Sequence, residues 1–199
     1  IYQLKNRVKF NIKHIGSGVE RILYGLFLKT VLADNIAPLV DKGFLINASE
    51  LSAIDVWTLS FLFGFQIYFD FSAYSHIAIG SARCMGIQFP ENFNFPYAAT
   101  SFKEFWKRWH ISLSSWIRDY LYLPLMGIKV LDRSTGGINI ATKNNQKKNN
   151  FSLFLTWAIM GLWHGANWTF VFWGLYHSLL IYIERIMIGI KINVIPPNI

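Results

Sequence analysis

Cysteine, charge and the motifs of well-known soluble enzymes are all scarce in this chain of 199 residues. The single cysteine, Cys84, excludes an intrachain disulfide, and the sequence has no closely spaced thiol and histidine pattern that would bind zinc. There is also no Walker loop, no G-x-S-x-G elbow and no dinucleotide fingerprint. Cys84 either packs against its neighbours or carries an acyl group as a nucleophile.

Charged residues make up only 15% of the chain, whereas soluble domains contain about a quarter. Hydrophobic residues reach 53% and aromatic residues 17%, which predicts an integral membrane protein. The formal net charge is +8, but the basic residues flank the apolar runs instead of forming one face of a compact domain. That pattern favours cytoplasmic loops and membrane lipid headgroups as neighbours and argues against nucleic acid.

The apolar runs predict an all-α, multi-pass membrane protein. We expect helices at about 15–33, 53–69, 71–85, 101–122, 151–166 and 168–188, and a mobile loop at 129–150. Basic residues before the first helix, in the loop and after the last helix place these parts in the cytoplasm, with residues 34–50 on the outer side.

The segment 101–122 has the pattern of a basic amphipathic helix at the membrane surface. Ser101 and Glu104 have the spacing of a capping box, and aromatic and aliphatic residues recur every three or four positions after them. His110 falls on the apolar face, so we expect its side chain to point inward. By itself, such a histidine is more often a packed core residue than a catalyst.

Asp70 lies at the end of the apolar run 53–69, and two interpretations remain open. Its carboxylate either caps a helix or forms an ion pair, or it orients a catalytic histidine.

His164 interrupts the apolar run between Phe151 and Met187, and an ionisable side chain in such a run indicates a functional site. It lies 13 residues beyond Phe151, roughly 20 Å along a helix. His164 and His110 together suggest acid–base chemistry, since histidine titrates near neutral pH and can take a proton from a hydroxyl. The G-x-x-x-G spacing of Gly161 and Gly165 predicts close packing of another helix.

Several stretches resemble the membrane-bound O-acyltransferase family, in the branch that contains bacterial alginate O-acetylation and D-alanyl transfer proteins. The most specific are Phe105-Trp106-Lys107-Arg108-Trp109-His110 and Gly161-Leu162-Trp163-His164-Gly165-Ala166, together with residues 85–97, 116–122, 32–35 and 69–74. The resemblance covers nearly the whole chain.

The resemblance implies a multi-pass enzyme of the bacterial inner membrane, with a partial form of the family fold over residues 1–199. It implies transfer of an acyl group, most simply acetyl, from a thioester donor such as acetyl-CoA or an acyl carrier to a hydroxyl of an exported polysaccharide such as alginate. D-alanyl transfer to teichoic acid is the alternative within the family. A periplasmic or extracellular acetylation protein is the implied partner, and neither a metal nor a tightly bound cofactor is needed because the thioester is already activated.

On the family pattern His164 is the essential histidine and general base, and His110 is the second signature histidine. The candidate supporting residues are Asp70, Trp163, Asn167, Arg118 and His177. His177 either lines the same site as His164 or packs among aromatic residues. Arg118 either pairs with Asp119 or meets a carrier protein.

The chain begins with Ile1 rather than Met, and helices that complete the family's fold precede the matching region, so we expect a piece of a longer protein. A second class of function therefore stays open. The chain could serve as a non-catalytic scaffold or channel component of a polysaccharide export or modification complex.

Overall fold

The computed structural model describes residues 3, 11–128 and 146–194, and all regular elements within these ranges are helices. The expected all-α fold class is confirmed for this part of the chain. The chain divides into two compact units, residues 1–92 and 93–199, and each is described by itself.

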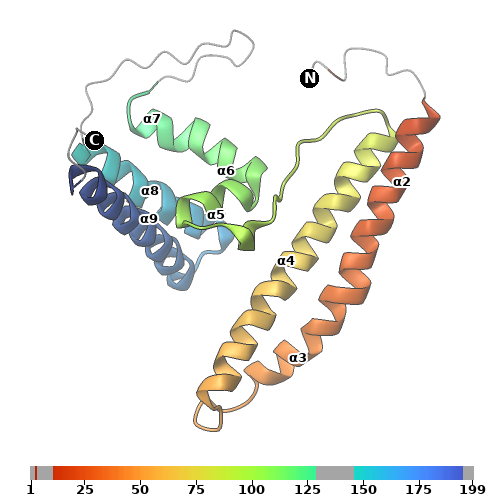
Figure 1. Cartoon of the computed structure of the whole chain (residues 1–199), viewed down its shortest axis with the longest axis horizontal. Coiled ribbons are helices and arrows are strands. Elements are labelled where there is room, and N and C mark those ends of the chain that lie inside the picture. The colour runs from red at the N-terminus through yellow and green to blue at the C-terminus, as the bar shows by residue number, and fades with distance from the viewer. Residues whose placement is uncertain (1–2, 4–10, 129–145, 195–199) are drawn as a thin grey trace. The chain divides into compact units, whose positions relative to one another are not determined.

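The first unit is built on two long helical segments that lie side by side (Figure 1). Helix α2, Ile12–Phe27, continues through a π-helical stretch, Leu28–Ala33, into α3, Asp34–Phe44. Helix α4, Ala53–Cys84, returns along them and begins at Ser52. Ser52 and Asp55 form a reciprocal capping box, with the Asp55 carboxylate accepting the Ser52 amide at 2.9 Å.

Glycines allow the two segments of the first unit to approach closely. A Cβ built on Gly80 of α4 would lie 2.6 Å from the carbonyl oxygen of Gly18, and one on Gly25 would lie 2.8 Å from that of Ala73. Small residues at such crossings let helix backbones meet, as is typical of membrane helices.

Two boundaries predicted for the first unit are wrong. The helix expected at 15–33 extends to Phe44 with Pro38 inside it, and the helices expected at 53–69 and 71–85 are one continuous helix. Asp70 lies inside this continuous helix, and its carboxylate meets Lys29 of the neighbouring segment, with Lys29 Nζ 2.5 Å from Asp70 Oδ1. Lys29 also pairs with Asp34 at 2.9 Å.

The second unit joins several short helices to a long helical hairpin. The short elements are η2 Pro96–Ala98, α5 Phe102–Arg108, α6 Ile111–Ile117, η3 Arg118–Tyr122 and α7 Leu123–Leu125. The helix expected at 101–122 is therefore broken, and the break falls at Trp109 and His110. Residues 129–145 of the predicted mobile loop lie outside the described residues, and residues 146–150 belong to α8.

Helices α8, Gln146–His164, and α9, Trp168–Val194, form the hairpin and pack side by side (Figure 1). Glycines again bring the backbones together, because a Cβ on Gly174 would lie 2.2 Å from the carbonyl oxygen of Trp157. The buried core of this unit consists of Ile117, Leu153, Trp157, Met160 and Ile181. Helix α6 thus packs on the hairpin through Ile117.

Two helical segments in the described ranges, Ile12–Phe44 and Trp168–Ile188, are long and apolar enough to cross a bilayer. Large apolar side chains are also exposed along α4 and α9, among them Trp57, Phe61 and Phe172.

Candidate active site

His110 occupies the break between α5 and α6 in a left-handed backbone conformation, with φ 44° and ψ 55°. Such a conformation is unfavourable for a residue with a Cβ and is concentrated at functional sites. The carbonyl oxygen of His110 accepts the Ser114 amide at 2.9 Å, which starts α6. The position of the half-buried ring is therefore set by a backbone break, and not by the face of a continuous helix as the sequence suggested.

His164 is the last residue of α8 and lies just before the turn to α9. Its ring meets Trp163 and Trp173 edge to face, with centroid distances of 4.9 Å and 5.2 Å. Asn167 ends the turn, and its side-chain oxygen accepts the Thr169 amide at 3.0 Å. Asn167 thus caps α9, while the exposed imidazole of His164 contacts both Trp163 and Trp173.

The two histidines share one electrostatic environment in the second unit. Burial lowers the pKa of His110, and the positive charge of His164 lowers it further. Both effects favour the neutral form of the His110 ring. Within the described ranges no cluster of three or more histidine, cysteine or acidic side chains could hold a metal ion.

His177 packs among three tryptophans. The centroid of its ring lies 4.8 Å from that of Trp173, 5.0 Å from that of Trp106 and 5.8 Å from that of Trp157. Trp173 therefore contacts both His177 and His164. The packing interpretation of His177 fits this arrangement. The contact of Trp173 with His164 was not predicted, because only the aromatic character of Trp173 distinguishes it in the sequence.

The sequence left two interpretations of Arg118 open, an ion pair with Asp119 or contact with a carrier protein. The structure shows the ion pair, with Arg118 Nε 2.8 Å from Asp119 Oδ1. The pair is not fully solvated, because Asp119 is only 9% exposed. Its carboxylate is buried where α6 passes into η3.

Asp70 and Cys84 belong to the first unit. Asp70 forms its ion pair with Lys29, which matches the ion-pair interpretation. Cys84 packs against α2, with its sulfur 3.8 Å from the carbonyl oxygen of Ile15. The packing interpretation of Cys84 fits this contact.

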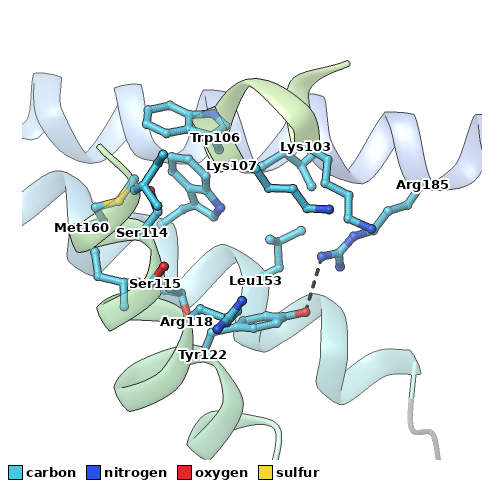
Figure 2. Close-up of a pocket in the computed structure, with 15 residues that line it drawn as sticks. Lys103, Trp106, Lys107, Ser114, Ser115, Arg118, Tyr122, Leu153, Met160 and Arg185 are labelled. Atoms are coloured by element: carbon cyan, nitrogen blue, oxygen red, sulfur yellow. Dashed lines mark hydrogen bonds between the residues drawn. The ribbon is translucent and has the colours of Figure 1, made fainter. Parts of the chain in front are cut away.

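A cavity of about 410 Å³ opens in the second unit between α5, α6, α8 and α9 (Figure 2). Four cationic side chains line it: Lys103, Lys107, Arg118 and Arg185. Figure 2 shows Lys103, Lys107 and Arg185 directed toward the same space. No pattern in the sequence indicated this cavity, because its lining comes from helices up to about 80 positions apart.

Comparisons with known proteins show the family of the chain. Residues 3–190 match the model of the membrane-bound O-acyltransferase family. The chain is 40% identical over 194 residues to the probable alginate O-acetylase of Azotobacter vinelandii, which covers 98% of this chain and 35% of that protein. It is 41% identical over 181 residues to the peptidoglycan O-acetyltransferase of Helicobacter pylori, covering 91% of this chain and 32% of that protein.

A more distant relative is the teichoic acid D-alanyltransferase of Streptococcus thermophilus, 31% identical over 179 residues, which covers 89% of this chain and 40% of that protein. The chain thus spans about a third of the length of the first two relatives. The family match nevertheless extends over nearly all of its residues, including both histidines. The chain belongs to the membrane-bound O-acyltransferase family.

Proposed function

We propose that this chain supplies the catalytic histidines of an O-acyltransferase that moves an acetyl group from a thioester donor to a hydroxyl of an exported polysaccharide. The observation that carries the proposal is that His164, at the end of α8, and His110, in the left-handed break before α6, belong to one compact unit of a chain that is a member of this family. The names of the 40% and 41% identical relatives favour acetyl transfer to a cell-surface polysaccharide, with alginate as the leading acceptor.

In the proposed reaction the acceptor oxygen attacks the thioester carbonyl carbon while His164 takes the hydroxyl proton. The carbon–sulfur bond then breaks, and the leaving thiolate receives the proton from the imidazolium, so that an ester and a thiol are formed. The C-terminal end of α8 carries partial negative charge, which stabilises the imidazolium formed at His164. No metal or tightly bound cofactor takes part in this scheme.

His110 has a different role in this proposal. Burial, followed by His164, lowers the pKa of His110 and so favours the neutral imidazole, which would stabilise the developing oxyanion by donating its N–H. In this proposal His164 is the base and His110 is the hydrogen-bond donor. Trp163 supports His164 by contact and Asn167 by capping α9, whereas Asp70, Arg118 and His177 act through packing and ion pairs.

We place the protein as a multi-pass component of the bacterial inner membrane. The two apolar helical segments and the exposed apolar side chains of α4 and α9 support this placement. The expected partners are membrane lipid, the polysaccharide acceptor and a periplasmic or extracellular acetylation protein, and nucleic acid is not among them. The 31% identical relative keeps D-alanyl transfer to teichoic acid as the second candidate.

The test follows a labelled acetyl donor into envelope polysaccharide, in membranes that contain the chain. We expect His164→Gln to abolish transfer, because glutamine keeps a polar side chain of similar length but cannot act as a base. His76→Gln is the matched control, since His76 lies in the first unit against Tyr24. Wild-type transfer by an inserted His164→Gln chain would contradict the mechanism.

No transfer by the inserted, unsubstituted chain would favour the other class of function. In that case the chain acts as a non-catalytic scaffold or channel component of a polysaccharide export complex. D-alanyl transfer is recognised in the same membranes by label from a D-alanyl thioester and not from the acetyl donor.

A further inference from the structure

A second cavity, of about 300 Å³, opens in the first unit, where α2 begins and α4 ends side by side (Figure 1). His14 and Ser17 line it from α2, Ile79 and Arg83 line it from α4, and residues 86–89 close it from the segment after α4. Among the described residues no carboxylate lines this cavity. Arg83 therefore gives it a positive charge.

Arg83 has no counter-ion in the part of the chain that the structure describes. Its side chain is half-buried in the cavity wall and forms no ion pair there. Glu91, two residues beyond the lining segment, is already paired with Arg21. The last turn of α4 favours a cation, but it supplies only a partial charge. Because a half-buried charge without a partner costs free energy, Arg83 indicates an anion from outside the described residues.

Three further side chains that can form hydrogen bonds line the cavity together with Arg83, namely those of His14, Ser17 and Gln88. The Nδ1 atom of His14 is closed off from solvent, which leaves Nε2 as the ring nitrogen available to a ligand. The Ser17 hydroxyl donates to the His14 carbonyl oxygen at 3.3 Å, so its lone pairs remain for a donor on the ligand. The cavity thus fits an anion that also carries hydroxyl groups.

The cavity lies at one end of a helical segment that is long enough to cross a membrane. Ile12–Phe44 has 33 residues, or about 50 Å of helix, whereas the hydrocarbon core of a bilayer is about 30 Å thick. In a membrane-bound protein the ends of this segment therefore reach the level of the lipid headgroups. Phe89, which lines the cavity and is 54% exposed, offers an apolar surface for a lipid chain at the same place.

We propose that this cavity binds the phosphate diester of an anionic glycerophospholipid. Arg83 holds the phosphate through its planar guanidinium, and His14 donates to another phosphate oxygen. Ser17 and Gln88 bind the hydroxyls of the headgroup. Free phosphate shares the anionic chemistry, but it would leave these two side chains and Phe89 without contacts, so the lipid fits better. The inference goes beyond the proposed function, because it involves neither the donor nor the acceptor of acyl transfer.

The test measures binding by the purified full chain in neutral detergent. The probes are dioctanoylphosphatidylglycerol, dioctanoylglycerol, which lacks the phosphoglycerol headgroup, and inorganic phosphate as the free anion. Because charge-assisted hydrogen bonds discriminate strongly, we expect dioctanoylphosphatidylglycerol to bind about tenfold more tightly than dioctanoylglycerol.

Substitutions then locate the site. Arg83→Gln is expected to remove the preference for the phosphate-bearing lipid. Lys13→Gln is the matched control, because Lys13 is an exposed cation that precedes His14 but does not line the cavity, and it should leave the preference intact. Arg83→Lys keeps the charge but not the planar fork, so we expect binding to weaken several-fold. Circular dichroism shows whether each variant is folded.

Equal binding of the two lipids would overturn the proposal, as would a preference that survives Arg83→Gln or is lost as fully in Lys13→Gln. Should Arg83→Gln not fold, unchanged binding by Arg83→Lys would overturn it as well. Binding of inorganic phosphate that depends on Arg83, together with equal binding of the lipids, would assign the cavity to a free anion instead. Because no acyl transfer is measured, failure of the proposed function does not affect the result.

Discussion

The backbone of Gly161 lies directly against that of Phe170, because a Cβ built on Gly161 would come 2.2 Å from the Phe170 carbonyl oxygen. The contact lies near the closed end of the α8–α9 hairpin, three positions before His164. A rigid backbone group gives way less readily than a flexible side chain. The helix crossing beside the candidate active site therefore depends on the absence of a side chain at Gly161.

Gly161→Ala is expected to destabilise the hairpin by about 1–3 kcal/mol, the usual cost of overpacking. Gly16→Ala is the control, since a Cβ there meets nothing within 4 Å, and it should stabilise α2 by about 0.5–1 kcal/mol. Unfolding of the detergent-solubilised chain, followed by circular dichroism, measures both. Equal stability of Gly161→Ala and the unsubstituted chain would disprove the close contact.

His110 offers a test of the backbone break. Asparagine tolerates the left-handed conformation better than a β-branched residue does, so His110→Val should be less stable than His110→Asn by about 1–2 kcal/mol. Both variants should lose acyl transfer, because neither keeps the imidazole. The comparison uses the same unfolding assay, and a valine variant as stable as the asparagine variant would contradict a left-handed residue 110.

Glu104 makes the stability of α5 depend on pH. The Thr100 backbone amide, followed by Arg108, lowers the pKa of Glu104 to about 2. Because the folded pKa lies below the unfolded value, the carboxylate stabilises the fold above about pH 4.5, and this contribution is lost as pH falls toward about 2.

The melting temperatures of the wild-type chain and Glu104→Gln should therefore differ near neutral pH and converge in acid. The difference should be small, since the carboxylate is solvent-accessible. A constant difference from about pH 7 to about pH 2 would show that the carboxylate contributes nothing.

Lys29 should be more important to stability than Asp70. Removing the charge of Lys29 leaves two carboxylates without their cation, whereas Asp70→Asn leaves Lys29 paired with Asp34. All three side chains are partly exposed, so Asp70→Asn should cost about 1 kcal/mol or less and Lys29→Met more. Unfolding assays rank the two variants, and the reverse order would show that another cation balances these carboxylates.

The sequence predicted the features that depend on local pattern. The hairpin of α8 and α9 follows from the apolar run around His164, and the start of α5 follows from Ser101 and Glu104. Even there the structure adds detail. Ser101 Oγ accepts the Glu104 amide at 3.1 Å as expected, but the Glu104 carboxylate turns to Thr100 instead of completing the predicted box.

The features that the sequence could not predict depend on partners distant along the chain. The apolar periodicity continues through Trp109 and His110, so it gives no sign of a break there. Asp70 suggested a helix end because its neutralising partner, Lys29, is 41 positions away on another helix. The roles of Trp173 and the cationic cavity likewise arise only when helices assemble.

The short turn between α8 and α9 has a consequence for biosynthesis. Only Gly165, Ala166 and Asn167 separate the two helices, so their contacts form between near neighbours in the chain. Pairing of this kind is fast and needs no element made earlier. The contacts of His164 with Trp163 and Trp173 are thus expected to form soon after the ribosome releases α9. The surroundings of His110 form only when α6 packs onto the hairpin, which follows it in the chain.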